Sequence, residues 1–123
     1  MRLPGLCSLM ILWAIAAPAL AADAEQGKKL FQPCARCHST VADSASQLLG
    51  PPLNGVVGRK AASVEDYRYS SAMRASGITW TEQDLKEYIA NPQAKVKGTR
   101  KVLTSTLAPD QIDDIVAYLK TLK

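Results

Sequence analysis

Residues 34–38 read CARCH, which brings two thiols and an imidazole into one short stretch of chain. Two thiols three positions apart, near the end of a helix, can each form a thioether bond to a vinyl group of a haem. The neighbouring imidazole can then bind the iron from below. The motif is therefore typical of a c-type haem attachment site, with Cys34 and Cys37 as the attachment points and His38 as the proximal iron ligand.

Other uses of the same residues are weaker. A structural zinc site needs four ligands, and residues 22–123 offer only these two cysteines and one histidine unless carboxylates join them. A thioredoxin-like redox pair needs a βαβ unit, for which no strand pattern is present. A disulfide closing so short a loop would add little stability. These readings stay open beside haem attachment.

The first 21 residues have the pattern of a cleaved secretory signal peptide. A single Arg2 precedes an apolar run over residues 9–17, and Pro18 is followed by small residues. We expect cleavage after Ala21 or Ala22, which leaves residues 22–123 as the mature domain and removes Cys7. Elsewhere no apolar run approaches the roughly 20 residues of a membrane-crossing helix. We therefore expect a periplasmic protein with no stable membrane insertion after cleavage.

The mature chain has few large side chains with which to build a core. Its aromatic residues are Phe31, Tyr67, Tyr69, Trp80, Tyr88 and Tyr118. Small exported domains usually make up such a deficit with disulfides, a metal or a cofactor. The whole sequence has 15 basic and 11 acidic side chains, a net charge of +4 that is too small to predict nucleic-acid binding.

Three helices are predicted from capping residues and apolar periodicity. Asp23 and Gln26 indicate a start for a helix over residues 24–33, and Thr81 and Asp84 indicate one over residues 82–90. The third begins at Pro109, followed by an apolar stripe at Ile112, Ile115, Val116, Leu119 and Leu122. Residues 39–63 are rich in Gly, Pro and Asn and read as a long loop. The sequence predicts an all-α domain whose loops wrap something other than protein.

Several further motifs follow the CARCH segment in a specific order. They are Gly27 and Phe31 in the first helix, Gly50-Pro51, Gly58-Arg59-Lys60, Tyr67-Arg68-Tyr69-Ser70, Gly77-Ile78-Thr79-Trp80, and Tyr88 and Tyr118. In their order and spacing they resemble the class I cytochromes c, and more closely the mitochondrial-like and cytochrome c2 branch. The resemblance covers nearly the whole mature chain and implies a small helical domain wrapping one covalently attached haem c.

The resemblance also implies roles for individual residues. Pro51 would lie against the proximal histidine, and its segment would orient the imidazole through a backbone carbonyl. Arg59, Tyr69 and Trp80 would hold the haem propionates, and Tyr88 would face the distal side of the haem. Tyr67 and Thr99, which lie in matching segments, complete the implied set of cofactor-binding residues.

The chain departs from this family on the distal side of the haem. Where the family ends a Gly-Thr-Lys stretch with an iron-binding methionine, residues 97–101 read KGTRK and place Lys101 at that position. We predict that the neutral amine of Lys101 is the sixth iron ligand. The alternatives are Lys97 or Lys95 from the same loop, the single mature methionine Met73, water, or an empty position.

The function implied by the resemblance is single-electron transfer between redox proteins, by a monomer that is not an enzyme. Arg36, Lys95, Lys97 and Arg100 stand where the family has a ring of lysines, which weakly implies a partner with an acidic docking face. The alternative is a haem sensor that binds small ligands, or a redox enzyme subunit, using a labile or open sixth position.

Overall fold

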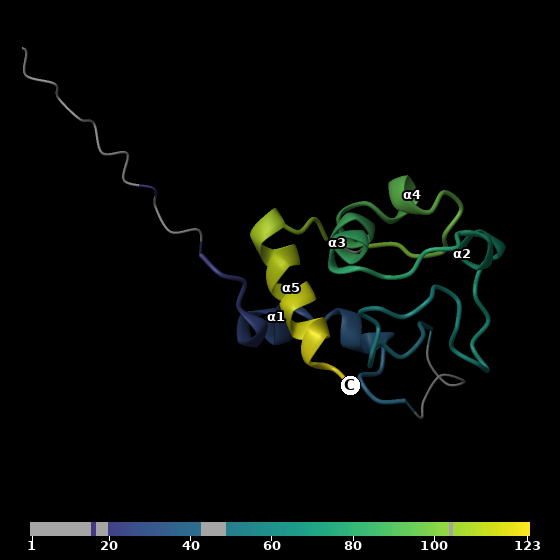
Figure 1. Cartoon of the computed structure of the whole chain (residues 1–123), viewed down its shortest axis with the longest axis horizontal. Coiled ribbons are helices and arrows are strands. Elements are labelled where there is room, and N and C mark those ends of the chain that lie inside the picture. The colour runs from purple at the N-terminus through teal and green to yellow at the C-terminus, as the bar shows by residue number, and fades with distance from the viewer. Residues whose placement is uncertain (1–15, 17–19, 43–48, 104) are drawn as a thin grey trace, which may run out of the picture.

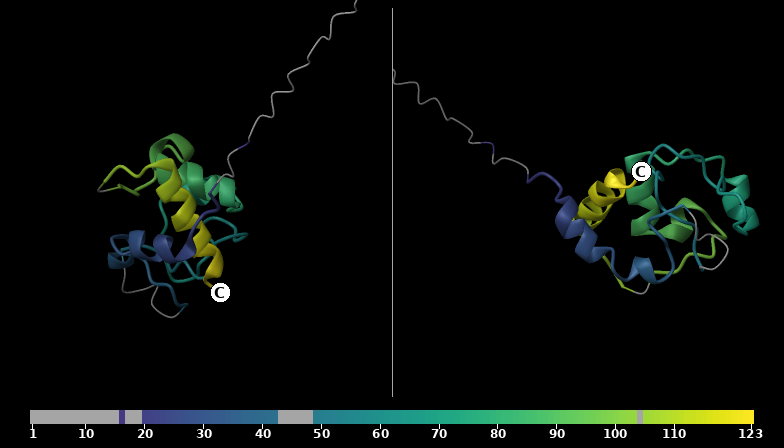
Figure 2. Two further views of the ribbon diagram at one scale, coloured as in Figure 1. Left: turned by 90° about the vertical axis from the view of Figure 1, so that its left-hand side faces the viewer. Right: turned by 90° about the horizontal axis from the view of Figure 1, so that it is seen from below.

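The computed structural model describes residue 16 and residues 20–42, 49–103 and 105–123. The predicted signal peptide, residues 1–21, lies almost wholly outside the described residues. No helix in the described part of the chain is both long and apolar enough to cross a membrane. The helices α1 and α5 cross at one end of the domain and α2 lies at the other, with loops between them (Figure 1, Figure 2).

The crossing of α1 (Ala24–Leu30) and α5 (Pro109–Thr121) depends on Gly27. A β-carbon at this position would lie 1.9 Å from the backbone oxygen of Asp114, so only glycine allows the two backbones to approach. Below the crossing, the rings of Phe31 and Tyr118 pack with their centroids 5.3 Å apart. The helices α1 and α5 therefore form one packed pair.

The first helix is shorter than predicted, which corrects the expected end at residue 33. α1 ends at Leu30, and Asp23 caps its start by accepting hydrogen bonds from the Glu25 and Gln26 amides. Pro33 cannot continue an α-helix because its ring would clash with the carbonyl of the residue four positions earlier. A separate turn of 3-10 helix, η1 (Cys34–Arg36), follows and carries the first thiol.

The helix predicted over residues 82–90 is confirmed as α3 (Glu82–Ala90), with the Thr81–Asp84 capping box formed in both directions. This helix ends where the sequence predicts, but a further short helix that was not predicted follows at once. Asn91 ends α3 and at once caps the short helix α4 (Pro92–Lys95) by accepting from the Ala94 amide. Pro92 takes the first helical position, where a missing N–H costs nothing.

One more short helix, α2 (Ser71–Ala75), was also not predicted, because five residues are too few to show periodicity. The described part of residues 39–63 consists of turns and irregular chain, as expected. In the part of the chain that the structure describes, β structure is limited to an isolated bridge between Lys60 and Thr79. The all-α prediction is confirmed.

The core lies between α5 and the segments around it. The four buried residues of α5 belong to its predicted stripe, Ile112, Ile115, Val116 and Leu119, while the fifth, Leu122, is the half-buried residue that follows the helix. Phe31, Val56, Trp80, Leu85 and Val96 are the larger partners buried with them. Ion pairs of 2.8 Å, Lys86 with Asp113 and Lys120 with Glu82, tie α3 to α5 at the surface.

Candidate functional site

A cavity of about 740 Å³ lies between the helical pair and the loops. Its walls come from α1, η1, α2, α3 and α5 and from the segments that connect them. This volume is in the range of sites for small molecules and cofactors, about 300–1,000 Å³. Every site residue predicted from the sequence lines it, namely Cys34, Cys37, His38, Pro51, Arg59, Tyr67, Tyr69, Trp80, Tyr88, Thr99 and Lys101.

The imidazole of His38 is fixed in the wall by two neighbouring residues. Its Nδ1 lies 2.7 Å from the Pro51 carbonyl oxygen, which can only accept, so Nδ1 carries the proton and donates it. The Nε2 lone pair is therefore free to bind a metal. Burial lowers the pKa of His38, which favours this neutral form. The ring lies so close to Gly50 that a β-carbon there would be 2.5 Å from its Cε1 atom.

The two thiols sit at either end of the η1 turn. The Cys37 and His38 amides both donate to the Cys34 carbonyl, at 3.0 and 2.9 Å. Both thiols are unpaired, and burial raises the pKa of Cys34. Across the described residues no three His, Cys, Asp or Glu side chains come together as metal ligands, so the structure does not form the closed zinc site considered above.

A second wall presents hydrogen-bond donors to the cavity. Arg59 donates to the carbonyls of Asn54 and Pro52, both at 2.9 Å, and its guanidinium has further donors beyond these. Tyr69 accepts a hydrogen bond from the Val64 amide, which leaves its own proton to donate, and burial raises its pKa. Trp80 is 7% exposed and adds an indole N–H. This wall suits a ligand that carries carboxylates.

Tyr67 lies beside this wall with a different partner. Its ring meets the Tyr69 ring edge-on at 4.8 Å, and its hydroxyl donates to the Leu49 carbonyl at 2.7 Å. The Tyr67 hydroxyl therefore donates its proton to the backbone next to Gly50 and not into the cavity. Tyr67 closes the cavity and supports the segment under His38.

The distal wall joins α3 to the loop that follows α4. The hydroxyls of Tyr88 and Thr99 lie 2.7 Å apart, and the Lys101 amide donates to the Thr99 hydroxyl at 3.4 Å. Burial raises the pKa of Tyr88, so it stays protonated. Met73, which is 8% exposed, lines the same cavity from α2.

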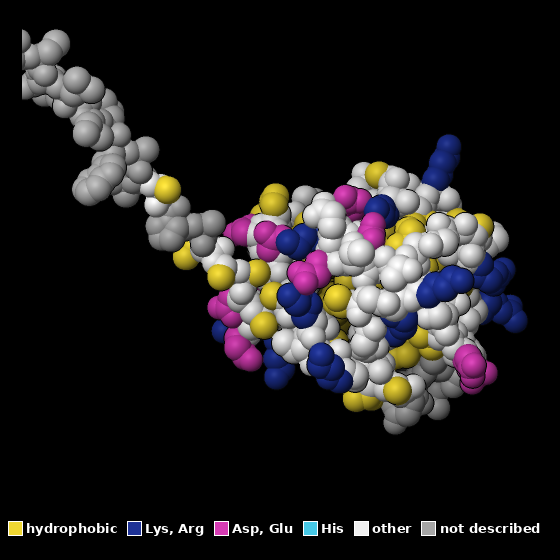
Figure 3. All heavy atoms as spheres, in the orientation of Figure 1, with side chains coloured by type: hydrophobic (Ala, Val, Ile, Leu, Met, Phe, Trp, Pro, Cys, Tyr) yellow, Lys and Arg dark blue, Asp and Glu magenta, His cyan; other side chains and the backbone are white. Residues whose placement is uncertain are grey.

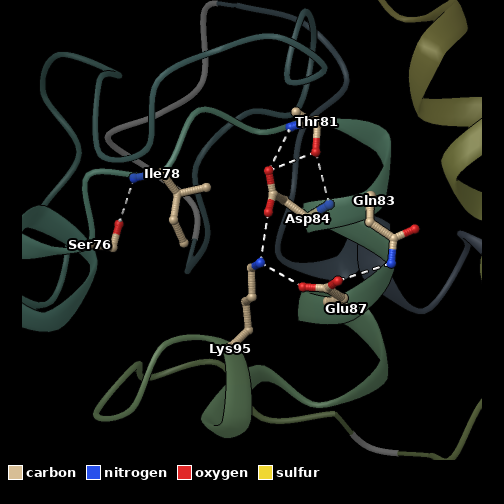
Figure 4. Close-up of polar contacts among 7 residues, drawn as sticks. All are labelled: Ser76, Ile78, Thr81, Gln83, Asp84, Glu87 and Lys95. Carbon is tan, nitrogen blue, oxygen red and sulfur yellow. Dashed lines mark hydrogen bonds and ion pairs between the residues drawn. The ribbon is translucent and has the colours of Figure 1, made fainter.

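The structure separates the three lysines considered as distal ligands. The Lys95 ammonium lies 2.7 Å from a carboxylate oxygen of Asp84 and 2.6 Å from one of Glu87 (Figure 4). These carboxylates raise the pKa of Lys95 and hold it away from the cavity. Lys97 is exposed and does not line the cavity. Of these three lysines, only Lys101 lines the cavity.

The charge of Lys101 acts on the proximal motif as well. Burial is the main cause of the raised pKa of Cys34 and the lowered pKa of His38, and the Lys101 charge lowers both. Lys101 is half-buried. Its ammonium therefore shares one electrostatic environment with the imidazole across the cavity.

Sequence reasoning missed Gln93, which does not line the cavity. Its side chain holds the loop that follows α4 and contains residues 97–101, here called the distal loop. Its amide nitrogen donates to the Thr99 carbonyl at 2.7 Å, and its amide oxygen accepts from the Gly98 amide at 3.2 Å. Nothing in the local sequence marks a glutamine in a four-residue helix for this role. The contact arises only when the loop turns back over α4.

These features fit a haem group. The imidazole offers a free Nε2, two thiols lie beside it, and Gly50 gives the ring space that a β-carbon would fill. Apolar side chains from Leu30, Leu53, Leu85, Ile115 and Leu119 line the interior, while Arg59 and Tyr69 bring polar groups to one side.

Comparison with known proteins agrees with this geometry. A family model described as cytochrome c matches residues 24–123. The chain is 41% identical over 112 residues to a cytochrome c2 of Blastochloris viridis, covering 91% of this chain and 87% of that protein. It is 45% identical over 97 residues to a cytochrome c-550 of Nitrobacter winogradskyi, covering 79% and 88%. The solved structure of cytochrome cH from Methylobacterium extorquens matches with a TM-score of 0.73 and 44% identity, covering 81% of this chain and 99% of that one.

The chain belongs to the cytochrome c family. It is a c-type cytochrome of the class I, cytochrome c2 type, with covalently bound haem c. It carries electrons and is not an enzyme.

Proposed function

We propose that the protein is an exported single-electron carrier whose haem is attached through Cys34 and Cys37, with His38 as proximal and Lys101 as distal ligand. Residues 1–21 are removed during export to the periplasm, and residues 22–123 form the working domain. A mature N-terminus at Ala22 or Asp23 in the purified protein is the expected result of this processing. When bound, haem c supplies the iron that gains and loses one electron.

The placement of His38 and Lys101 in one cavity carries this proposal. The two residues are 63 positions apart in sequence, yet both line the same cavity. The Lys95 ammonium is held in ion pairs with two carboxylates, and Lys97 lies outside the cavity. Met73 is the remaining competitor, and its thioether lies among apolar core neighbours.

The other cavity residues hold and shield the group. Arg59, Tyr69 and Trp80 would bind its propionates, and the Arg59 charge is fixed by two carbonyls before any ligand binds. Pro51 holds the His38 ring in one tautomer. The Tyr88–Thr99 pair supports the distal loop.

Lys101 would also set the reduction potential. An amine nitrogen is a harder donor than a thioether sulfur and favours ferric over ferrous iron. For a one-electron couple a tenfold change in relative binding equals about 59 mV, so a thousandfold ferric preference lowers the potential by about 180 mV. Lys101→Met should therefore raise the measured potential by an amount of that order. An unchanged potential would contradict the proposed ligand.

The partners proposed for this carrier are redox proteins with an acidic docking face. Besides the proposed ligand Lys101, the residues that line the cavity include four cations, Arg59, Lys60, Arg68 and Arg100, and a single carboxylate, Asp66. On the face shown in Figure 3, acidic side chains lie mainly over the end with α1, α3 and α5, where they are mixed with Lys and Arg, while Lys and Arg predominate at the α2 end. This asymmetry favours approach of a negative surface to the cavity mouth. A monomer is sufficient for the function.

A further inference from the structure

We propose that Gln93 is a positioning residue that holds the distal loop over the haem site and thereby limits exchange of the sixth ligand. This inference rests on the proposed role of Lys101. Gln93 itself would touch neither haem nor iron, since it does not line the cavity. It acts through the backbone of residues 98 and 99.

One side chain holds two consecutive peptide groups. The Gln93 amide nitrogen donates to the Thr99 carbonyl at 2.7 Å, and its amide oxygen accepts from the Gly98 N–H at 3.2 Å. A single hydrogen bond would leave the loop free to pivot. Two bonds to neighbouring peptides fix its orientation as well as its distance from α4.

The loop also lies close to α2 at Gly98. Gly98 has a φ of +93°, and a β-carbon at this position would lie 3.3 Å from the Ala72 side chain. The chain therefore runs through a narrow space between Gln93 and Ala72. Any movement of the loop away from α4 must break the Gln93 bonds.

Thr99 passes this restraint on to Lys101. Its amide donates to the Val96 carbonyl at 3.0 Å, and its hydroxyl bonds to Tyr88 on α3. The Lys101 amide in turn donates to that hydroxyl at 3.4 Å. The backbone two residues before the proposed ligand is thus held by α3, by α4 and by its own turn.

The helix that presents Gln93 is itself anchored. A four-residue helix has little stability of its own. Asn91 caps it, Pro92 is buried, and the Lys95 ammonium ties it to Asp84 and Glu87 on α3 (Figure 4). Gln93 therefore bonds to the loop from a helix whose position is fixed by its contacts with α3.

The test compares the ferric haem-loaded protein with four variants, Gln93→Ala, Lys101→Ala, their double mutant and Gln32→Ala. Imidazole is the probe, and its dissociation constant is read from the optical spectrum. Gln32 is a matched control, because it is an exposed glutamine that also donates to a backbone carbonyl, that of Lys28. Hydrogen exchange at the Thr99 amide gives a second readout that does not depend on the haem spectrum.

We expect Gln93→Ala to bind imidazole about tenfold more tightly than the wild type, equivalent to about 1.4 kcal/mol. Exchange at the Thr99 amide should accelerate, and Gln32→Ala should match the wild type in both readouts. Lys101→Ala should bind imidazole tightly, and adding Gln93→Ala to it should change nothing further, because the ligand that Gln93 positions is then gone.

The contrary outcomes are distinct. If Lys101→Ala tightens binding while Gln93→Ala does not, the role of Gln93 is overturned and Lys101 ligation stands. If Gln93→Ala tightens binding equally with and without Lys101, it does not act through that lysine, and the inference fails. If Lys101→Ala leaves imidazole binding unchanged, the proposed ligand is wrong, and the inference falls with it.

Discussion

The imidazole of His38 lies directly against Gly50, where a β-carbon would fall 2.5 Å from Cε1 and 2.7 Å from Nδ1. The carbonyl oxygen of Pro51, the next residue, accepts a hydrogen bond from Nδ1–H at 2.7 Å. Two adjacent residues thus set both the position and the tautomer of the ring. Gly50 and Pro51 therefore orient the proposed iron ligand His38 through their backbone atoms.

Gly50→Ala is expected to push the imidazole aside and break its bond to Pro51. Overpacking of this kind costs about 1–3 kcal/mol, which denaturant unfolding should detect. The optical spectrum of the haem should change as well, because the ring loses its orientation.

Gly55→Ala provides the control for this change. Its β-carbon would meet no atom within 4 Å, but its φ of +62° makes alanine strained. It should lower stability while leaving the haem spectrum intact. A Gly50→Ala protein with an unaltered spectrum would contradict the proposed place of His38.

Replacing both Cys34 and Cys37 with Ala should abolish covalent attachment of the cofactor. In a host that matures c-type cytochromes, the wild-type haem should remain with the protein through acidified organic extraction, and the variant's should not. The variant should also be largely unfolded by circular dichroism, because the group fills the cavity at the centre of the domain. A wild-type protein that folds without colour, around a disulfide or zinc, would refute attachment at these residues.

The sequence was most informative where a residue must be of one type for local chemical reasons. The Thr81–Asp84 capping box and the apolar stripe of α5 both depend on residues within a few positions along the chain, and the structure confirms them. Gly27, one of the residues that carry the resemblance, lies where α1 and α5 cross.

The features that were missed depend on contacts distant in sequence or on very short elements. The helix α1 ends at Leu30, three residues before the predicted end, because Pro33 cannot continue an α-helix even though the apolar pattern does. The second role of Asn91, as the cap of α4, is invisible when the following helix has only four residues. The bonds of Gln93 exist only after the loop turns back, and the pairing of Lys95 with α3, which removes it as a ligand, is equally non-local.

Acid should weaken the link between α3 and α4. Hydrogen bonds from Lys95, and then from Thr81, lower the pKa of Asp84 from 3.8 to about 2. A lowered pKa means that the stabilisation is complete above about pH 4 and is lost as the pH falls towards 2. The group is near the surface, so its contribution to the free energy of unfolding is at most about 1 kcal/mol.

The comparison of wild type with Asp84→Asn measures this contribution. The stability difference between the two should be present at pH 5–6 and should shrink as the pH falls through the interval between 4 and 2. Lys95→Met should remove the larger part of the same pH dependence. A difference that stays constant across this interval would show that the ion pair does not contribute.

Electron exchange with an acidic redox protein should slow as salt is added. The cations that line the cavity steer encounter over distances of about a Debye length, roughly 10 Å at 0.1 M salt. Stopped-flow rates at increasing ionic strength check this, and Arg68→Gln, which removes one exposed cation, should flatten the dependence. A rate that does not change with salt would contradict the proposal of an acidic partner but would not affect the proposed haem site.

The central claim, that Lys101 is the distal iron ligand, is tested most directly by the optical and electron paramagnetic resonance spectra of the oxidised wild-type protein beside those of Lys101→Ala. We predict a low-spin ferric haem with no thioether-to-iron charge-transfer band in the wild type, and a shift to high-spin iron with water at the sixth position in the variant. A sulfur charge-transfer band in the wild type would identify Met73 as the ligand. Identical spectra for the two proteins would show that Lys101 does not bind the iron.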